Sequence, residues 1–385
     1  MSSQSDPAPS PVPVLTGPRW DGPSPAPAID VAVAVEDAAT ELARLLAQVT
    51  PADHEAHGRA SRHLARLATP PGALGHLANL ALELACLTGH PPPVPSRPAL
   101  LLAAGDHGVH RHGVTPWAQS TTRRLAEAAL AGRAGVSTAA RTVGARVCVL
   151  DVGLVQPIAA HPALVVAPVV RGTSDLHEQD AMSVVQARRA LLLGARLAAG
   201  LMADGADLLV LGDLGVGNAT ASEALVAATT GVDPDYLTGR PVNGAAEHVA
   251  VRRQVLRTAI RRVGLRSPLQ TLAGLGGAEH AALVGAILAA AGRRVPVLLD
   301  GLADAAAALI AVGLAPDAGQ ALIVGSVSPE PAARIAVGHL GLRPLLDLDV
   351  RLGDGTGALL AVPAVQAAAR LLHDVATLEE AGLAT

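Results

Sequence analysis

The chain contains no lysine, so all 29 of its basic residues are arginines. This absence excludes a Walker A phosphate loop, which needs its lysine, and it excludes Schiff-base chemistry, which needs a lysine amine. Any cation that faces a phosphate in this protein must therefore be an arginine, a histidine, a helix N-terminus or a metal.

Aromatic residues and cysteines are almost as scarce. There is no phenylalanine, Tyr236 is the only tyrosine, and Trp20 and Trp117 are the only tryptophans. Because half of the 385 residues are hydrophobic, the chain can still bury a large core, and that core must be aliphatic. Cys86 and Cys148 stand apart with no CxxC pair, which indicates neither a disulfide framework nor a zinc ribbon.

Charge and hydropathy exclude further classes. The net charge of -4 and the scattered arginines do not fit a nucleic-acid-binding surface. The N-terminus has no basic-then-apolar signal, and charge-free apolar runs such as 281–292 fall short of the roughly 20 residues that span a bilayer. We therefore expect a cytoplasmic protein with no nucleic-acid or membrane partner.

From residue 99 onward, short apolar runs alternate with alanine-rich helical segments. The expected strands are 99–103, 146–150, 164–166, 208–211, 295–299, 321–324 and 345–348. The expected helices are 120–131, 136–143, 181–203, 222–228, 248–263, 277–291, 303–311 and 331–340. This alternation predicts an α/β fold with a mostly parallel sheet flanked by helices, in which ligands bind at the carboxyl ends of the strands.

The two ends of the chain have another pattern. Residues 1–28 are rich in proline and serine, which predicts a disordered tail. Helices are expected at 29–46, 54–67, 74–87 and 362–375. We expect 29–98 and 359–385 to form a small helical domain beside the α/β domain at 99–358.

One glycine-bracketed carboxylate follows the expected strand 208–211. The segment GDLGVGNAT at 212–220 places Asp213 at the strand end, where glycines let the backbone approach a ligand and a helix begins. The residues that would face a phosphate are Gly215, Gly217, Asn218 and Thr220. Taken alone, the segment fits a plain tight turn equally well.

A second such carboxylate follows the expected strand 345–348. In RLGDGTGA at 351–358, Gly353, Gly355 and Gly357 leave little cover over Asp354. A solvated acid in a simple turn is an equal alternative for this segment alone. Two acids beside open backbone N–H groups nevertheless suit a phosphorylated substrate whose reaction needs a base.

Histidines gather after the expected strand 99–103. Asp106 and His107 stand at its end, and His110 and His112 follow. No carboxylate or cysteine partner for a metal is recognisable, so we expect no metal site, and Asp106 and His107 orient the loop or line the site. Asp300 is a further acid at a strand end.

Together these segments resemble the CobT family, the nicotinate-nucleotide:dimethylbenzimidazole phosphoribosyltransferases, in the same order from about residue 65 to 382. The matching blocks are PPGALG at 70–75, AGDHGV at 104–109, VTPWAQ at 114–119, DVG at 151–153, RGT at 171–173, GDLGVGNAT at 212–220, TGR at 238–240, LGGAE at 275–279, DG at 300–301, VSPEP at 327–331 and LGDGTGA at 352–358.

The resemblance implies transfer of phosphoribose from nicotinate mononucleotide to 5,6-dimethylbenzimidazole or a related base. The products are α-ribazole 5′-phosphate and nicotinate, in cobalamin lower-ligand assembly. It also implies a homodimer and a small domain built from both chain ends. Because this chemistry is redox-neutral and the sequence offers no convincing ligand cluster, we expect no cofactor.

The resemblance also implies roles for particular residues. Asp354 stands where the family has its presumed general base, and Asp213 would stabilise the ribose in the transition state or bind its hydroxyls. The phosphate and ribose would be held by Gly215, Gly217, Asn218, Thr220, Gly355 and Gly357. The base would be bound by Trp117, Gln119 and Leu352, with Asp106, His107 and Asp300 in support.

Several positions depart from the family pattern. Asp354 replaces a glutamate, Trp117 a tyrosine and Ala219 a threonine, and the family has lysine at Thr69 and Arg252. PVN at 241–243 stands for Gly-Thr-Gly, and GS at 325–326 for Ser-His. Two alternatives therefore stay open: a homologue that uses another acceptor, such as a substituted benzimidazole, a purine or a phenol, and a catalytically weak protein that binds the nucleotide or the base.

Overall fold

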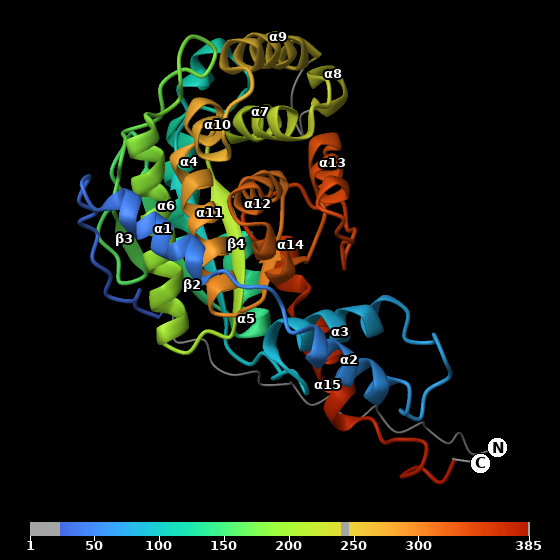
Figure 1. Ribbon diagram of the computed structural model, residues 1–385. Coiled ribbons are helices and arrows are strands. Elements are labelled where there is room, and N and C mark those ends of the chain that lie inside the picture. Colours follow the sequence, from blue (N-terminus) through green and yellow to red (C-terminus); the bar gives the residue numbers. More distant parts are fainter. Residues whose placement is uncertain (1–23, 240–245, 384–385) are drawn as a thin grey trace, which may run out of the picture.

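The fold is built around one parallel sheet. The computed structural model describes residues 24–239 and 246–383. Six strands run in the order β3-β2-β1-β4-β5-β6, and all neighbours pair in parallel (Figure 1). The strands are β1 (Pro98–Gly105), β2 (Arg146–Gly153), β3 (Leu164–Val166), β4 (Leu208–Leu214), β5 (Val297–Leu299) and β6 (Leu322–Val324). The predicted α/β class with a parallel sheet is confirmed.

The prediction of a seventh strand at 345–348 was wrong. These residues lie beside the end of β6, where the amides of Leu345 and Leu346 donate to the carbonyls of Val324 and Gly325. They make only one isolated parallel bridge there. The chain cannot continue as a strand because Asp349 adopts a left-handed φ of 55° and turns it into the next loop.

Helices cover both faces of the sheet. The longer ones are α1 (Ala38–Gln48), α2 (His54–Leu64), α3 (His76–Thr88), α4 (Ser120–Leu130), α5 (Gly135–Val143), α6 (Val184–Ala203), α7 (Asn218–Thr230), α9 (Ala246–Val263), α11 (Ala278–Gly292), α12 (Leu302–Leu314), α13 (Pro331–His339) and α15 (Val362–Asp374). Short helical segments that the sequence pattern did not predict are α8 (Pro234–Leu237), α10 (Pro268–Leu275), α14 (Thr356–Leu360), η1 (Gly108–His112) and η2 (Pro316–Ala321).

Strand side chains alternate between the two faces, so the sheet has two hydrophobic cores. Leu101 and Leu209 point into the core beneath α6, α11 and α12. Leu100 and Leu208 point into the opposite core, which contains residues of α4, α5 and α14. The sheet is therefore covered on both sides, as its nearly continuous hydrophobic strands predicted.

The N-terminal segment differs from the prediction in two places. The expected helix at 29–46 begins only at Ala38, because the guanidinium of Arg196 takes the carbonyls of Asp30 and Ala32 out of any helical pattern. The predicted tail included residues 24–28, but the Ala26 amide donates to the Pro162 carbonyl at 2.7 Å and Pro27 is buried. The rest of that predicted tail, 1–23, lies outside the described residues.

Helices from the two chain ends meet below the sheet. Helices α2 and α3 pack against α15, and Leu67 and Thr377 form an antiparallel bridge between the two ends (Figure 1). Helix α1 instead packs on α6 and α11 of the α/β body. The predicted division into a large and a small domain stays a prediction.

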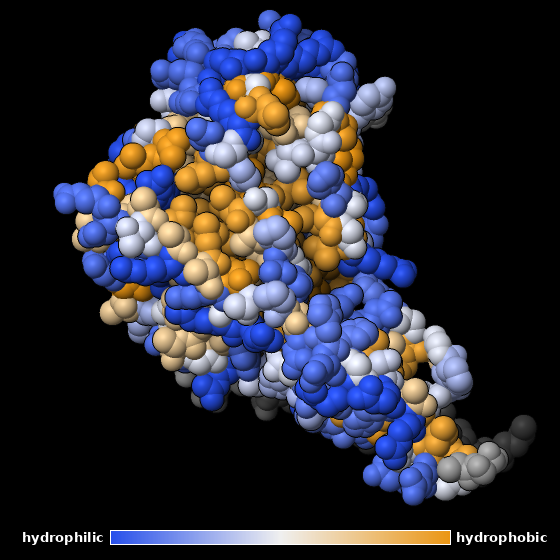
Figure 2. Space-filling view, in the orientation of Figure 1, coloured by the Kyte–Doolittle hydropathy of each residue, from blue (hydrophilic) through white to orange (hydrophobic). Residues whose placement is uncertain are grey.

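The surface in Figure 2 is divided by hydropathy. Hydrophobic residues gather over the middle of the α/β body, around the positions of α11 and α12 in Figure 1, whereas hydrophilic residues cover the region of α9. In the described ranges, no helix has both the length and the apolar character needed to cross a membrane.

Helices α6 and α11 pack backbone to backbone through two glycines. A Cβ on Gly194 would lie 1.9 Å from the carbonyl oxygen of Ala282, and one on Gly285 would lie 1.8 Å from that of Leu191. Real Cβ atoms essentially never approach so closely, so only glycine allows this crossing. It is the contact that holds the helical layer over the centre of the sheet.

Gly285→Ala should therefore destabilise the protein. Overpacking of a tight core typically costs about 1–3 kcal/mol, so we expect a melting temperature several degrees below that of the parent. The matched control is Gly338→Ala in α13, where a Cβ meets nothing within 4 Å and alanine favours the helix. Equal melting temperatures for Gly285→Ala and the parent would contradict the observed crossing.

Candidate active site

One cavity of about 530 Å³ opens at the carboxyl ends of β4 and β5. Five of the sequence blocks meet there, through residues 114–117, 213–220, 300–301, 328 with 330, and 350–353. The strand order reverses between β1 and β4, and such a reversal is where doubly wound sheets bind ligands. The cavity therefore lies where the topology places a site.

The predicted site residues divide into two groups. Those that line the cavity are Asp213, Gly215, Gly217, Asn218, Thr220, Trp117, Leu352 and Asp300. Those that do not are Asp354, Gly355, Gly357, Gln119, Asp106 and His107. The second group lies directly behind the first, and most of its members hold the lining residues in place.

Asp213 is one of two buried aspartates that line the cavity, and Asp300 is the other. The Asp213 carboxylate accepts a hydrogen bond of 2.5 Å from the side-chain amide of Asn218. Burial raises the pKa of Asp213 to about 6, although His280 and Asn218 act in the opposite direction. The group can therefore exist in either protonation state near neutral pH, and it can face a developing positive charge.

The turn before α7 is fixed from behind. The Val216 amide donates to the hydroxyl of Thr122 at 3.0 Å, and Thr122 also hydrogen-bonds to Asp106. Gly217 has a φ of +99°, a conformation that side chains other than glycine rarely adopt. Asp106 thus acts on the cavity through Thr122. Thr122, which the family resemblance groups with the VTPWAQ block, also lines the cavity.

The two carboxylate turns pack directly on each other. The Asp213 amide donates to the Gly353 carbonyl at 3.0 Å, and a Cβ on Gly212 would lie 2.4 Å from the carbonyl group of Asp354. Asp300 completes the arrangement by accepting the amides of Gly355 at 3.0 Å and Ala358 at 2.7 Å. Burial, and then the nearby charge of Asp354, raise the pKa of Asp300 to about 7.

Asp354 itself is not among the residues that line the cavity. Its carboxylate caps α14, accepting the amide of Thr356 at 3.1 Å and the hydroxyl of Thr356 at 2.5 Å. Burial raises the pKa of Asp354, and the bonds from Thr356 oppose that rise. Its neighbour Gly353 lines the cavity. A side-chain rotation is therefore needed before the Asp354 carboxylate can reach a ligand there.

Exposed apolar side chains form the mouth of the cavity. Trp117 is 53% exposed and Leu352 is 59% exposed, and Leu125 of α4 joins them at 47%. The ring nitrogen Nε2 of His110 lies 2.9 Å from the Trp117 carbonyl and holds this loop. Leu125 was missed in the sequence, although its spacing of four residues from Thr121, another lining residue, places both on one helix face.

Two arginines line the cavity, the buried Arg252 and the exposed Arg351. Arg252 lines the cavity at 5% exposure and forms an ion pair with the fully buried Glu223. Burial raises the pKa of Glu223 to about 8, while Arg252 opposes the rise. Ser328 and Glu330 of the VSPEP block lie in the same wall. Only the family's lysine at position 252 pointed to this residue in the sequence.

The histidines have partners that the sequence did not reveal. His107 lies 2.8 Å from Glu279, and His112 lies 2.6 Å from Asp175, so the expectation that they lack carboxylate partners was wrong. His280 contacts the same Glu279 oxygen as His107 does. In both clusters the acids are already engaged by these imidazoles, and the absence of a metal stays a prediction.

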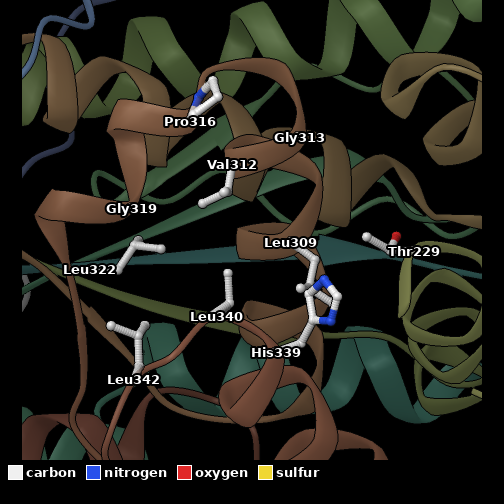
Figure 3. Close-up of a pocket in the computed structure, with 10 residues that line it drawn as sticks. All are labelled: Thr229, Leu309, Val312, Gly313, Pro316, Gly319, Leu322, His339, Leu340 and Leu342. Carbon is white, nitrogen blue, oxygen red and sulfur yellow. The ribbon is translucent and has the colours of Figure 1, made fainter. Parts of the chain in front are cut away.

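A second cavity of about 340 Å³ lies between α7, α12, α13 and β6. Its wall consists mainly of aliphatic side chains, with His339 beside Leu309 at the end nearest Thr229 (Figure 3). No sequence motif falls on this wall. The chemistry-bearing residues therefore assign the site to the cavity at the strand ends.

The fold is that of a doubly wound α/β protein, and its candidate active site lies at the strand ends. A protein-family model described as Phosphoribosyltransferase matches residues 49–383. The nicotinate-nucleotide–dimethylbenzimidazole phosphoribosyltransferase of Salinispora tropica is 45% identical over 361 residues, which cover 89% of this chain and 99% of that protein. The enzyme of the same name from Deinococcus radiodurans is 40% identical over 348 residues, which cover 89% of this chain and 95% of that protein.

A solved structure agrees with these relatives. The crystal structure of the nicotinate-nucleotide–dimethylbenzimidazole phosphoribosyltransferase from Thermus thermophilus matches with a TM-score of 0.83 at 41% identity, covering 86% of this chain and 99% of that one. This chain therefore belongs to the CobT family of nicotinate-nucleotide–dimethylbenzimidazole phosphoribosyltransferases, as its motifs predicted.

Asp213→Asn tests the electrostatic cost of the buried acid. The pKa of Asp213 is about 6 in the fold and 3.8 in its ordinary state, so the folded protein loses stability relative to the unfolded chain as the pH rises through this window. Asparagine does not ionise, so the variant does not lose this stability as the pH rises. At pH 8 we expect Asp213→Asn to be more stable than the parent by up to about 3 kcal/mol, with the gain vanishing near pH 4.

Denaturant unfolding at the two pH values measures this difference. The control is Asp374→Asn, which removes only an exposed ion pair with Arg370 and should be neutral at both. An Asp213→Asn variant no more stable than the parent at pH 8 would show that the ionised carboxylate is well compensated in the fold.

Proposed function

We propose that this protein transfers phosphoribose from nicotinate mononucleotide to 5,6-dimethylbenzimidazole or a related base, giving α-ribazole 5′-phosphate and nicotinate. The observation that carries this proposal is a cavity in which a buried acid, a helix N-terminus, a buried arginine and an apolar mouth meet. The relatives named above, 40–45% identical over most of the chain, support the same reaction.

The mononucleotide would bind along α7 and Arg252. The N-terminus of α7 attracts anions through its dipole, and Gly215 and Gly217 let a phosphate approach the backbone. Arg252 supplies the positive charge that a lysine-free chain must take from arginine. Its ion pair with Glu223 holds the guanidinium in the wall. Gly355 and Gly357 would act indirectly, through the loop that Asp300 holds.

The acceptor base would enter over Trp117 and Leu352. These exposed apolar side chains suit a flat heteroaromatic ring, which gains most from contact with apolar and aromatic surfaces. Gln119 stands at the N-cap of α4, behind this mouth, and is not part of the wall. Its predicted hydrogen bond to the base therefore requires the loop 114–119 to shift.

The chemistry asks for positioning and one proton acceptor. Pyridinium nicotinate is a good leaving group, so no strong general acid is needed, and Asp213 would stabilise the positive charge that develops on the ribose. The azole N–H proton would go to Asp354 as the other ring nitrogen attacks C1′. For this, the Asp354 carboxylate must leave Thr356 and rotate toward the cavity.

We also propose a homodimer in the cytoplasm, as the family resemblance implies. The hydrophobic surface over the middle of the α/β body fits a surface covered by a second subunit (Figure 2). Light scattering that reports a single chain of 38.6 kDa at micromolar concentration would contradict the dimer.

A direct assay tests the reaction. Purified protein is mixed with nicotinate mononucleotide and one base at a time from a panel of dimethylbenzimidazole, benzimidazole, adenine and a phenol. Mass spectrometry then follows nicotinate and the riboside phosphate. We expect both products in equal amounts with the benzimidazoles. If nicotinate is released only with adenine or the phenol, the protein is a homologue that uses another acceptor. If the protein binds the nucleotide tightly and releases no nicotinate, it is a binding protein.

Asp354→Asn should slow turnover if Asp354 accepts the proton. General-base contributions are typically about 10²–10⁴-fold, and we expect the kcat of the asparagine variant to fall within that range with little change in mononucleotide binding. Asp354→Glu should match or exceed the parent, because the longer side chain reaches further into the cavity. Asp374→Asn serves again as the control. Normal turnover by Asp354→Asn would move the proton acceptor elsewhere, with Asp213 the first candidate.

A further inference from the structure

A chain of buried polar side chains runs from the core to the active-site cavity. His107 and His280 both contact the same oxygen of Glu279, at 2.8 and 2.5 Å, and all three side chains are fully buried. On its other side, Nε2 of His280 lies 2.7 Å from the hydroxyl oxygen of Ser222, which is a lining residue of the cavity. None of the roles assigned above uses His280 or Ser222.

The chain continues into the first turn of α7. The Ser222 hydroxyl lies 2.9 Å from the carbonyl oxygen of Asn218, and the Asn218 side-chain amide donates to Asp213. His280 is therefore linked, through two intervening residues, to Asp213. The same first turn of α7 is the one proposed to hold the phosphate.

Burying the ionised Glu279 carboxylate costs more free energy than ordinary core packing would. Burial alone would raise the pKa of Glu279, but the two imidazoles hold it well below its usual value, so this acid stays ionised without exposure to water. Buried charges cost several kcal/mol in desolvation, and apolar residues of the same volume usually pack as well or better. The backbone also makes room for the acid, since a Cβ on Gly105 or Gly277 would lie within 2.4 Å of its carboxylate.

The hydrogen bonds define how His280 can act. Nδ1 of His280 faces Glu279 and also lies 3.1 Å from the Gly277 amide, while Nε2 faces Ser222. The Ser222 hydroxyl has a single proton, so it can donate to the Asn218 carbonyl only when Nε2 carries a proton and donates to Ser222. In that arrangement His280 holds Ser222 in the rotamer that reaches Asn218.

We propose that His280, oriented by Glu279 and His107, is a positioning residue for the transfer reaction: through Ser222 it fixes the first turn of α7 and thereby places Asn218 and Asp213 against the mononucleotide. This inference rests on the proposed function, because it assigns the turn to the bound nucleotide. It predicts that loss of the network affects the mononucleotide and leaves the acceptor base untouched.

The test uses Ser222→Ala, His280→Asn and their double variant in the phosphoribosyl-transfer assay, because asparagine reaches only the Nδ1 position and cannot contact Ser222. We expect each single variant to lose roughly 10- to 100-fold in kcat/KM for the mononucleotide, the scale of a displacement of about 1 Å at the site. The KM for dimethylbenzimidazole should not change. Because both residues act through one contact, the double variant should lose no more than the worse single variant.

Two controls separate positioning from folding. Ser137→Ala removes another buried serine hydroxyl, which lies in α5 and bonds the Ala129 carbonyl, and it should keep full activity. His280→Gln places an amide at the Nε2 position and should keep the contact to Ser222, and Ser222→Thr keeps the hydroxyl. Both variants should retain most of the activity that is lost in Ser222→Ala. Ser222→Ala also favours the helix, so this variant folds even where changes at His280 do not.

The pH profile adds an independent readout. Asp213 is faced by His280, Glu279 and His107 from the network and by Asp300 and Asp304 from the next strand end. Since His280 lowers the pKa of Asp213, its replacement by glutamine should move the acidic limb of kcat/KM to higher pH. Ser222→Ala, which leaves this charge in place, should not move the limb.

The outcomes are distinguishable. A parent protein that transfers phosphoribose, together with Ser222→Ala and His280→Asn variants of parental kcat/KM, would overturn the positioning role alone. Equal rises in KM for both substrates, or additive losses in the double variant, would overturn it too. A parent that releases no nicotinate with any base would instead overturn the proposed function.

Discussion

The site depends on one close contact between two backbones. Gly212 at the end of β4 lies directly under the carbonyl group of Asp354, with no space for even a Cβ between them. This contact brings Asp213 and Gly353 into hydrogen-bond distance and joins two acid turns that lie far apart in the chain. Asp300 then holds the far side of the second turn through two amides. Without Gly212 the two halves of the cavity wall would separate.

The close packing of these turns also places several buried carboxyl groups near one another. Asp213, Asp300 and Asp304 each have a raised pKa, chiefly because they are buried and then because other carboxylates lie near them. The fold thus keeps several acids whose ionisation opposes stability, which is common where a site must stabilise a cationic transition state. The two imidazoles next to Glu279 and the guanidinium of Arg252 supply the opposing charge. The protein holds its acids and cations in fixed positions before any ligand arrives.

The unusual composition has structural consequences. An aliphatic core of leucine, valine and alanine permits helices to approach closely, and the α6–α11 crossing uses this through Gly194 and Gly285. Having no lysine, the chain places the arginine Arg252 in the cavity wall, and a planar guanidinium needs a fixed partner to hold its direction. Glu223 is that partner, fully buried beside it. An arginine alone at this position would point less definitely into the cavity.

Local sequence determined the class of the protein, most of its helices, six of its strands and both carboxylate turns, because periodicity and glycine placement act over a few residues. It also determined the family, because the blocks occur in a fixed order. Only the tertiary structure decided which groups meet. In the structure the Asp354 carboxylate accepts the hydroxyl of Thr356, and Gln119 does not line the cavity. Glu279 contacts His107, which lies 172 positions away in the chain. Partners so far apart leave no local pattern, since their contact depends on how the strands and helices stack and not on their spacing along the chain.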